Sequence, residues 1–216
     1  MDGGSGKLAC AAYRMCRARA RLPEVLAAWS GKTFNTAAIS RQLGVSRPTV
    51  VAYVSKLERV DLVRLLPFYG GKRRPLLSLC SSPRGGLMES IIGKLCLIVP
   101  GSGFFWWKTG RTRQVDLIAD VGSERIGFCF PASPLARRRD WLPLDIAARR
   151  GVIRRGFLLH TGTRAFVVAS AVQALPADSF VREMDEWIFR RQSVRDGREA
   201  RARINSQCLA RGAGHR

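Results

Sequence analysis

The residues of this sequence that are best suited to chemistry are basic and hydroxyl side chains, gathered between residues 46 and 74. Such side chains make the hydrogen bonds and charge contacts by which proteins hold phosphate oxygens. One group falls on a predicted helix and the other follows a Gly-Gly pair. The two groups comprise Ser46, Arg47, Thr49, Lys56, Lys72, Arg73 and Arg74. These are the candidate residues for contact with nucleic acid.

Other kinds of site have weaker support in the sequence. The segment GGSGK at residues 3–7 suggests a phosphate-binding loop, but Leu8 replaces the hydroxyl that would bind Mg²⁺, and no strand precedes it. The six cysteines form no C-x-x-C pair and the chain has two histidines, which argues against a zinc site or a disulfide framework. We therefore expect no bound metal and no cofactor.

The charge of the chain points to an acidic partner. Lys+Arg number 37 and Asp+Glu 16, a formal net charge of +21, and residues 1–84 hold 15 of the bases but only four of the acids. Such an excess attracts nucleic acid or an acidic protein surface. The most apolar stretch, residues 91–107, is interrupted by Lys94 and by the segment PGSG, so it is too short to span a membrane. We expect a cytoplasmic protein with no membrane partner.

Residues 32–80 have the pattern of a winged helix-turn-helix. Asn35 or Thr36 can cap a helix over residues 37–43, Gly44 supplies a tight turn, and Ser46 can cap a second helix that runs to about residue 59. The apolar residues that would face the core are Ile39, Leu43, Val45, Val50, Tyr53, Val54 and Leu57. Two strands around a tight turn at Gly70-Gly71 complete the wing.

The rest of the chain predicts a mixed sheet with helices on its faces, so the fold class is α/β (α+β). A helical segment over residues 1–31, divided in two at Pro23, precedes the winged helix. SSPRGG at residues 81–86 is interpreted as a linker, residues 87–182 as the second domain, and residues 183–216 as a basic tail. Helices are expected at 87–97, 140–150 and 179–191, and strands at 104–109, 113–121, 125–130, 151–160 and 164–170.

Taken in order, these segments resemble the C-terminal half of a family of bacterial and archaeal AAA-type ATPases. In that family the ATPase domain is followed by a winged helix and by a domain of unknown function with a restriction-endonuclease-like fold. The winged helix is similar to NTAAISRQLGVSRPTVVAYVSKLERVDLVRLLPFY with GKRRPLL, and the second domain to LMESIIGKL, FFWWKTGRTRQVDLIADVGSERIGFCF and GVIRRGFLLHTGTRAFVVASAVQALP. The resemblance covers about residues 25–178 and implies that this chain lacks the ATPase domain.

The resemblance also implies where a nuclease of this fold would carry its catalytic groups. A Mg²⁺-dependent phosphodiesterase needs carboxylates for the metal and a lysine beside the attacking water. In the family's fold they come from a helix glutamate, a strand aspartate and a Glu-x-Lys pair on the next strand. Glu89 and Asp116 match the first two, whereas Cys129 and Pro131 stand at the Glu and Lys positions. The set is therefore interpreted as vestigial.

The sequence predicts a degenerate nuclease-like domain that works with the winged helix to bind DNA or a protein partner. Asp116 is then a structural residue, expected to pair with Arg113 or Arg125. The missing Glu-x-Lys pair and the missing phosphate-binding loop argue against enzymatic activity. The alternative is a nuclease that acts on DNA with Mg²⁺ as its cofactor. The oligomeric state is left open.

Overall fold

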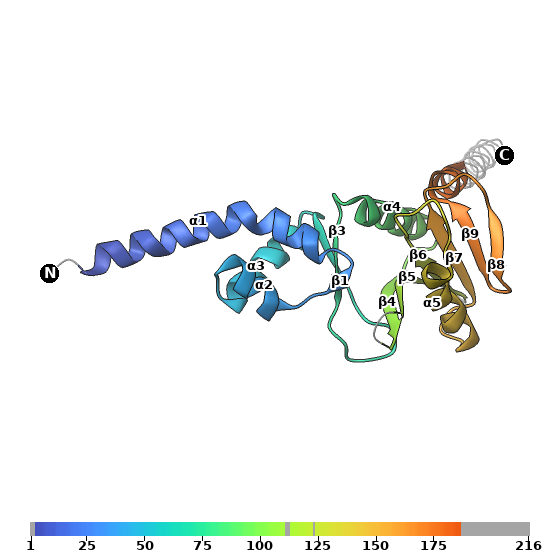
Figure 1. Ribbon diagram of the computed structural model, residues 1–216, viewed down its shortest axis with the longest axis horizontal. Helices are drawn as coiled ribbons and strands as arrows, with labels where there is room; N and C mark the ends of the chain where they lie inside the picture. Colours follow the sequence, from blue (N-terminus) through green and yellow to red (C-terminus); the bar gives the residue numbers. More distant parts are fainter. Residues whose placement is uncertain (1–2, 111–112, 123, 187–216) are drawn as a thin grey trace, which may run out of the picture.

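The computed structural model describes residues 3–110, 113–122 and 124–186, with side chains from residue 16 onward. It is a mixed α/β structure with one sheet on each side of a central helix, α4, as Figure 1 shows. We call the described residues up to 82 the first unit and those from 83 the second unit. Within the described ranges, no helix combines the length and the apolar character needed to cross a bilayer.

The first unit begins with one long helix, α1 (Gly3–Trp29). The expected break at Pro23 is wrong, because the helix continues through this residue. Pro23 is exposed, so the carbonyl that loses its hydrogen bond faces water, while Leu22, Val25 and Leu26 bury the opposite face. The phosphate-loop segment at residues 3–7 belongs to the same helix.

The next two helices form as their capping residues predict. Asn35 Oδ1 accepts a hydrogen bond from Ala38 N at 3.2 Å and begins α2 (Thr36–Leu43). Gly44, with φ of 67°, ends α2 in the left-handed conformation that glycine adopts without strain. Ser46 Oγ accepts from Thr49 N at 3.3 Å and begins α3 (Arg47–Glu58), whose residues Val50, Tyr53 and Val54 are buried.

A three-stranded antiparallel sheet completes the first unit, in the order β1-β3-β2. Its strands are β1 (Lys32–Thr33), β2 (Val63–Leu66) and β3 (Leu76–Leu79). The expected tight turn at Gly70-Gly71 is wrong, because residues 67–75 form a longer loop that reaches the second unit. Trp106 N donates to Pro67 O at 2.9 Å and Tyr69 N donates to Trp106 O at 2.8 Å. The loop therefore extends the ladder of the second sheet instead of closing a short hairpin.

The second unit begins with α4 (Pro83–Ile98), which includes most of the expected linker. Ser82 Oγ accepts from Gly85 N at 3.1 Å, and Pro83 fits the first turn because its missing N–H has no partner there. A Cβ at Gly85 would lie 2.0 Å from Leu79 O. The glycine that suggests a linker in the sequence instead allows the helix start to pack directly on β3.

A six-stranded sheet follows, in the order β4-β5-β6-β7-β9-β8. Its strands are β4 (Gly103–Thr109), β5 (Arg113–Val121), β6 (Glu124–Cys129), β7 (Arg155–His160), β8 (Phe166–Ala169) and β9 (Val172–Pro176). The pairs β6–β7 and β7–β9 are parallel and the others are antiparallel. Strand β9 was not predicted, since it is short and ends in a proline.

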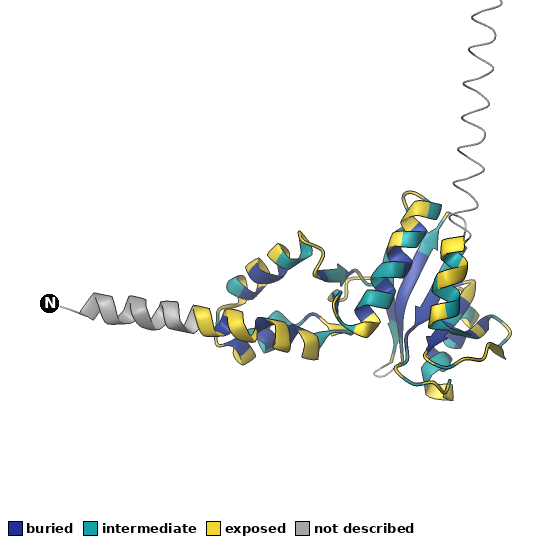
Figure 2. Ribbon diagram, turned by 90° about the horizontal axis from the view of Figure 1, so that it is seen from above, coloured by how far each residue is buried: buried dark blue, intermediate teal, exposed yellow. Residues whose placement is uncertain are grey.

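Helices cover both faces of this sheet, and α5 (Arg138–Arg149) crosses between the parallel strands β6 and β7. On one face α4 and the helical residues 177–186 share a core with the strands; on the other, α5 packs through Leu144 and Ala147. Figure 2 shows the buried strands between helices whose outer surfaces are exposed. The predicted closing helix 179–191 and the basic tail 183–216 extend past residue 186, beyond the described residues.

Two glycines of α4 provide a matched test of the packing at its start. Gly85→Ala should lower the free energy of unfolding by about 1–3 kcal/mol, because its Cβ meets the Leu79 carbonyl. Gly93 is exposed and a Cβ there meets nothing within 4 Å, so Gly93→Ala should raise it by about 0.5–1 kcal/mol. Urea denaturation measures both changes, and equal effects of the two variants would contradict this packing.

Candidate functional site

Asp116 lies in β5 at an irregularity of the sheet. Phe105 pairs with Ile118 and Trp107 with Val115, so Trp106 alone stands opposite two residues, Asp116 and Leu117. An extra residue of this kind is a β-bulge, which turns a side chain away from the regular alternation of the strand. The Asp116 side chain is only 5% exposed.

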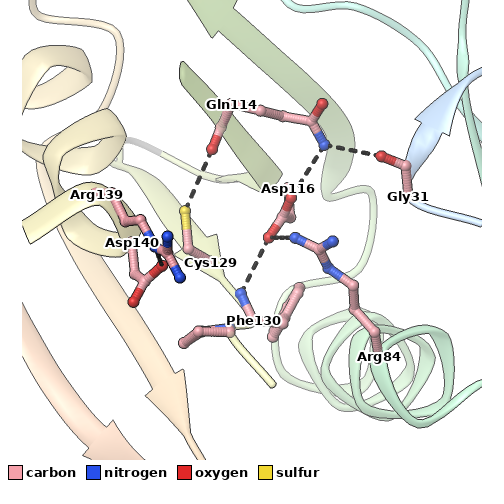
Figure 3. A pocket seen from close by; sticks show the side chains of 9 residues that line it. Gly31, Arg84, Gln114, Asp116, Cys129, Phe130, Arg139 and Asp140 are labelled. Atoms are coloured by element: carbon pink, nitrogen blue, oxygen red, sulfur yellow. Dashed lines mark hydrogen bonds and ion pairs between the residues drawn. The ribbon is translucent and has the colours of Figure 1, made fainter. Parts of the chain in front are cut away.

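Both carboxylate oxygens of Asp116 have protein partners, as Figure 3 shows. Oδ2 accepts from Arg84 Nη2, in the first turn of α4, and from Phe130 N at 3.0 Å. Oδ1 accepts from Gln114 Nε2 at 3.0 Å, which also lies 3.3 Å from Gly31 O in the first unit. The charge of Asp116 raises the pKa of the Arg84 guanidinium, against the opposing effect of burial. Asp116 and Arg84 therefore form a stable ion pair.

This ion pair borders an open cavity of about 260 Å³ between the two units. Its lining is mainly polar, and consists of Gly31, Arg84, Gln114, Asp116, Cys129, Phe130, Pro131, Arg139 and Asp140. Cys129 Sγ lies 3.5 Å from Gln114 O, to which it donates a weak hydrogen bond. Burial, and then the negative charge of Asp116, raise the pKa of the Cys129 thiol well above its usual value. The thiol is thus protonated and a poor nucleophile near neutral pH.

The structure does not bring together Glu89 and Asp116, the two acids that the resemblance assigns to a nuclease site. Glu89 lies on α4, where its Oε1 accepts from Arg64 Nε at 2.6 Å, and it is not among the residues that line the cavity. The described residues contain no group of three His, Cys, Asp or Glu side chains that could hold a metal ion. With its oxygens taken by Arg84, Gln114 and a backbone N–H, Asp116 does not fit the role of a Mg²⁺ ligand.

The expected partner of Asp116 is also wrong. Arg113 is exposed at the start of β5, and Arg125 donates to Tyr69 Oη and, at 2.9 Å, to Gly151 O. The actual partner, Arg84, was missed because its segment was interpreted as a linker. A sequence signal for it exists in Ser82-Pro83, the usual start of a helix, which would have placed Arg84 in a first turn.

The first group of candidate nucleic-acid residues lies on α3 and at its N-cap. Arg47 and Lys56 are exposed, and in the described part of the chain neither lies within 4 Å of a carboxylate oxygen. Ser46 and Thr49 are 2.8 Å apart between their hydroxyl oxygens, and Ser46 also caps the helix. These hydroxyls thus serve the fold first, whereas the charges of Arg47 and Lys56 are not balanced locally.

The second group of candidate residues lies on loop 67–75. Lys72, Arg73 and Arg74 are all exposed, and no carboxylate of the described residues pairs with them. The Arg73 guanidinium lies 4.9 Å from the centre of the Phe68 ring. Phe68 in turn packs edge-on against Trp106, with ring centres 5.0 Å apart. The three cations are therefore presented on a loop whose base is fixed to β4.

Comparison with known proteins gives a match to the first unit and none to the second. A family model described as a domain of unknown function (DUF8612) matches residues 14–82, about a third of the chain. The match ends at Ser82, the residue that caps α4. No curated protein and no solved structure matches the chain. The first unit is thus similar to a sequence family to which no function is assigned.

Removal of the Arg84 guanidinium tests the ion pair. Arg84→Ala leaves the Asp116 carboxylate buried without a cation, and we expect a loss of about 2 kcal/mol in the free energy of unfolding, less than a fully buried pair would cost because Arg84 is half-exposed. Arg84→Ala with Asp116→Asn should recover part of the loss. Arg149→Ala breaks a pair in which Arg149 is 77% exposed and should cost less than about 1 kcal/mol. Equal losses in Arg84→Ala and Arg149→Ala would contradict the assignment.

The raised pKa of Cys129 predicts a loss of stability in alkali. The unfolded chain releases this thiol proton near the ordinary cysteine pKa while the folded protein retains it, so the free energy of unfolding falls as pH rises above about 8.5. Cys129→Ala should reduce this slope by up to about 1.4 kcal/mol per pH unit. Cys96 is exposed, and Cys96→Ala should keep the original slope. Urea denaturation from about pH 8 to about pH 10 measures the slopes, and identical slopes in both variants would contradict the prediction.

Proposed function

We propose that the first unit is a winged helix-turn-helix that binds duplex DNA through α3 and loop 67–75. The observation that carries the proposal concerns Arg47 and Lys56 on α3, the helix that follows the Gly44 turn: both are exposed, and no carboxylate of the described residues pairs with either. In a helix-turn-helix the second helix lies in the major groove and its flanks contact phosphates. The three cations on loop 67–75 are suited to phosphate contact at the wing.

The small apolar area beside the cations of α3 favours DNA over an acidic protein partner for this surface. The exposed face of α3 presents Val51 and Ala52 between its cations, and Glu58 is the sole acid on the helix. A protein partner would be expected to use a larger apolar area around such residues. Contacts with phosphates need charge alone, so these side chains support binding to DNA with little reading of its bases.

For the second unit we propose a degenerate restriction-endonuclease-like domain without catalytic activity, as its resemblance to the ATPase family suggests. A nuclease of that fold needs its strand aspartate free to hold Mg²⁺. Here Arg84 neutralises Asp116, and Glu89 is bound to Arg64 away from the cavity. These contacts support a binding role over the alternative of a Mg²⁺-dependent nuclease. In the same proposal the chain corresponds to the non-ATPase part of that family.

The dependence of binding on salt tests the proposed function. The affinity for a mixed-sequence duplex, measured by fluorescence anisotropy, should fall steeply as KCl rises. The variant Lys72→Ala/Arg73→Ala/Arg74→Ala should reduce the slope of log K against log salt by roughly 2 to 3, because each lost phosphate contact removes about 0.9.

A charge-matched control is available in the second unit. The variant Arg138→Ala/Arg164→Ala/Arg182→Ala removes the same charge from exposed positions far from loop 67–75 in the sequence. It should keep the slope of the unmodified protein. Tight binding that is insensitive to salt, or an equal change of slope in both triple variants, would contradict the proposal.

A further inference from the structure

Two adjoining hollows lie at the edge of the second sheet where the parallel strands β7 and β9 begin. Their volumes are about 490 and 340 Å³, and both are lined by Arg154, Ser170 and Ala171. The Asp116 cavity lies at the other end of these strands, where β6 ends at Cys129. The two hollows are therefore separate from the site described above.

Arginines dominate this edge of the sheet. Arg125, Arg149, Arg154 and Arg155 line the two hollows. Arg149 pairs with Asp145 at 2.9 Å, so its charge is balanced. Arg154 Nη1 lies 3.5 Å from Glu124 Oε1, longer than the ~2.7–2.9 Å of a charge-assisted hydrogen bond.

Two of these arginines, Arg155 and Arg125, are not paired with a carboxylate of the described residues, so their charge is available to a ligand. Arg155 is exposed, and no carboxylate in the described ranges lies within 4 Å of it. Among the described residues, Arg125 bonds to neutral acceptors alone, Tyr69 Oη and Gly151 O. Its guanidinium also lies 5.3 Å from the centre of the Tyr69 ring. Arg125 is thus held in a fixed position without being neutralised, so little side-chain entropy is lost when it meets an anion.

The other groups at this edge also suit phosphate. Ser170 and Gln173 line the hollows, and the described residues offer no hydrogen-bond partner to either side chain. Hydroxyl and amide donors beside arginine are the usual contacts of phosphate oxygens.

We call Arg125, Arg154 and Arg155 at this end of the strands the arginine edge. It is connected to the proposed DNA surface through Tyr69. This residue belongs to loop 67–75 and precedes Lys72 by three positions, so their backbones are at most about 11 Å apart. The same side chain bonds Arg125 of the second unit. A duplex that lies on the cations of the loop would thus pass near the arginines of the edge.

We propose that Arg125, Arg154 and Arg155, with Ser170 and Gln173, bind backbone phosphates of the duplex held by α3 and loop 67–75. This inference rests on the proposed function and extends the nucleic-acid surface onto the second unit. The ligand is the phosphate oxygens of a DNA backbone, which these side chains recognise by charge and not by base sequence. The second unit then contributes to binding through an edge of its sheet that is remote from Asp116.

The test uses the full chain and a mixed-sequence duplex, with binding measured by fluorescence anisotropy over a range of KCl. Arg154→Ala/Arg155→Ala should reduce the slope of log K against log salt by about 2 and weaken binding by roughly 60-fold at about 0.1 M salt, because each lost phosphate contact removes about 0.9 from the slope. Arg154→Lys/Arg155→Lys keeps the charge and should keep most of the slope. Retention by the lysine variant excludes loss of folding as the cause.

The matched control removes two arginines from the opposite edge of the same sheet. Arg138→Ala/Arg164→Ala should leave the slope unchanged. Arg138 is the first residue of α5 and Arg164 follows the end of β7, so both lie away from the start of β7, where the arginine edge is. A slope that falls equally in both alanine pairs would overturn the inference, since general charge would then explain it.

The remaining outcomes separate the two proposals. If the unmodified protein does not bind the duplex, the proposed function fails and this inference fails with it. If only the loop variant changes the slope, the winged helix-turn-helix binds DNA and the arginine edge does not. A free phosphate compound is tested with pyrophosphate: a rise in Tm that Arg154→Ala/Arg155→Ala abolishes, with the DNA slope unchanged, would overturn the assignment to a duplex.

Discussion

The ion pair between Arg84 and Asp116 is the contact on which the relation between the two sheets depends. A carboxylate as buried as Asp116 is costly unless a cation and hydrogen-bond donors surround it. Arg84 can supply the cation because Ser82 starts α4 at the end of β3, with Gly85 pressed against Leu79. Gln114 then connects the same carboxylate to Gly31 O in the first unit. One buried charge thus specifies where the helix, both sheets and the end of α1 meet.

The same contact limits the chemistry of the cavity. Three of the about four acceptor positions of the Asp116 carboxylate are bound to Arg84, Gln114 and Phe130 N, and Arg84 balances its charge, so it is a poor ligand for a divalent cation. Beside it Cys129 is a neutral thiol and Pro131 has no side-chain donor, so neither replaces a catalytic glutamate or lysine. The cavity beside Asp116 is part of the junction between the two units, since Gly31 of the first unit lines it together with residues of the second. The exposed charges are therefore the better basis for function.

How much the sequence predicts depends on how local each determinant is. The helices α2 and α3 could be predicted because Asn35, Gly44 and Ser46 act on their own neighbours in the chain. The pairing of Asp116 with Arg84 could not, since it joins residues 32 positions apart across a bulge. The prediction of a tight turn in loop 67–75 was wrong for a similar reason. Gly70-Gly71 permits such a turn, but the packing of Phe68 on Trp106, 38 positions away, determines the conformation of the loop. The basic candidates were found because exposed charge needs no tertiary partner, whereas the arginine edge is assembled only when β7 and β9 pair.

Loop 67–75 makes a second junction between the units, and it carries three of the cations to which DNA binding is attributed in the proposed function. Its backbone pairs with Trp106 in both directions, and Tyr69 bonds Arg125, so the loop belongs structurally to both units. Cations on a free hairpin would lose conformational entropy on meeting DNA, whereas cations on a loop fixed at its base lose less. Because the loop and the arginine edge share Tyr69, their spacing is set by the packing of the second sheet. If the first unit binds DNA as proposed, that packing gives the second unit a role without catalysis: it holds the proposed phosphate-binding side chains at a constant distance from α3.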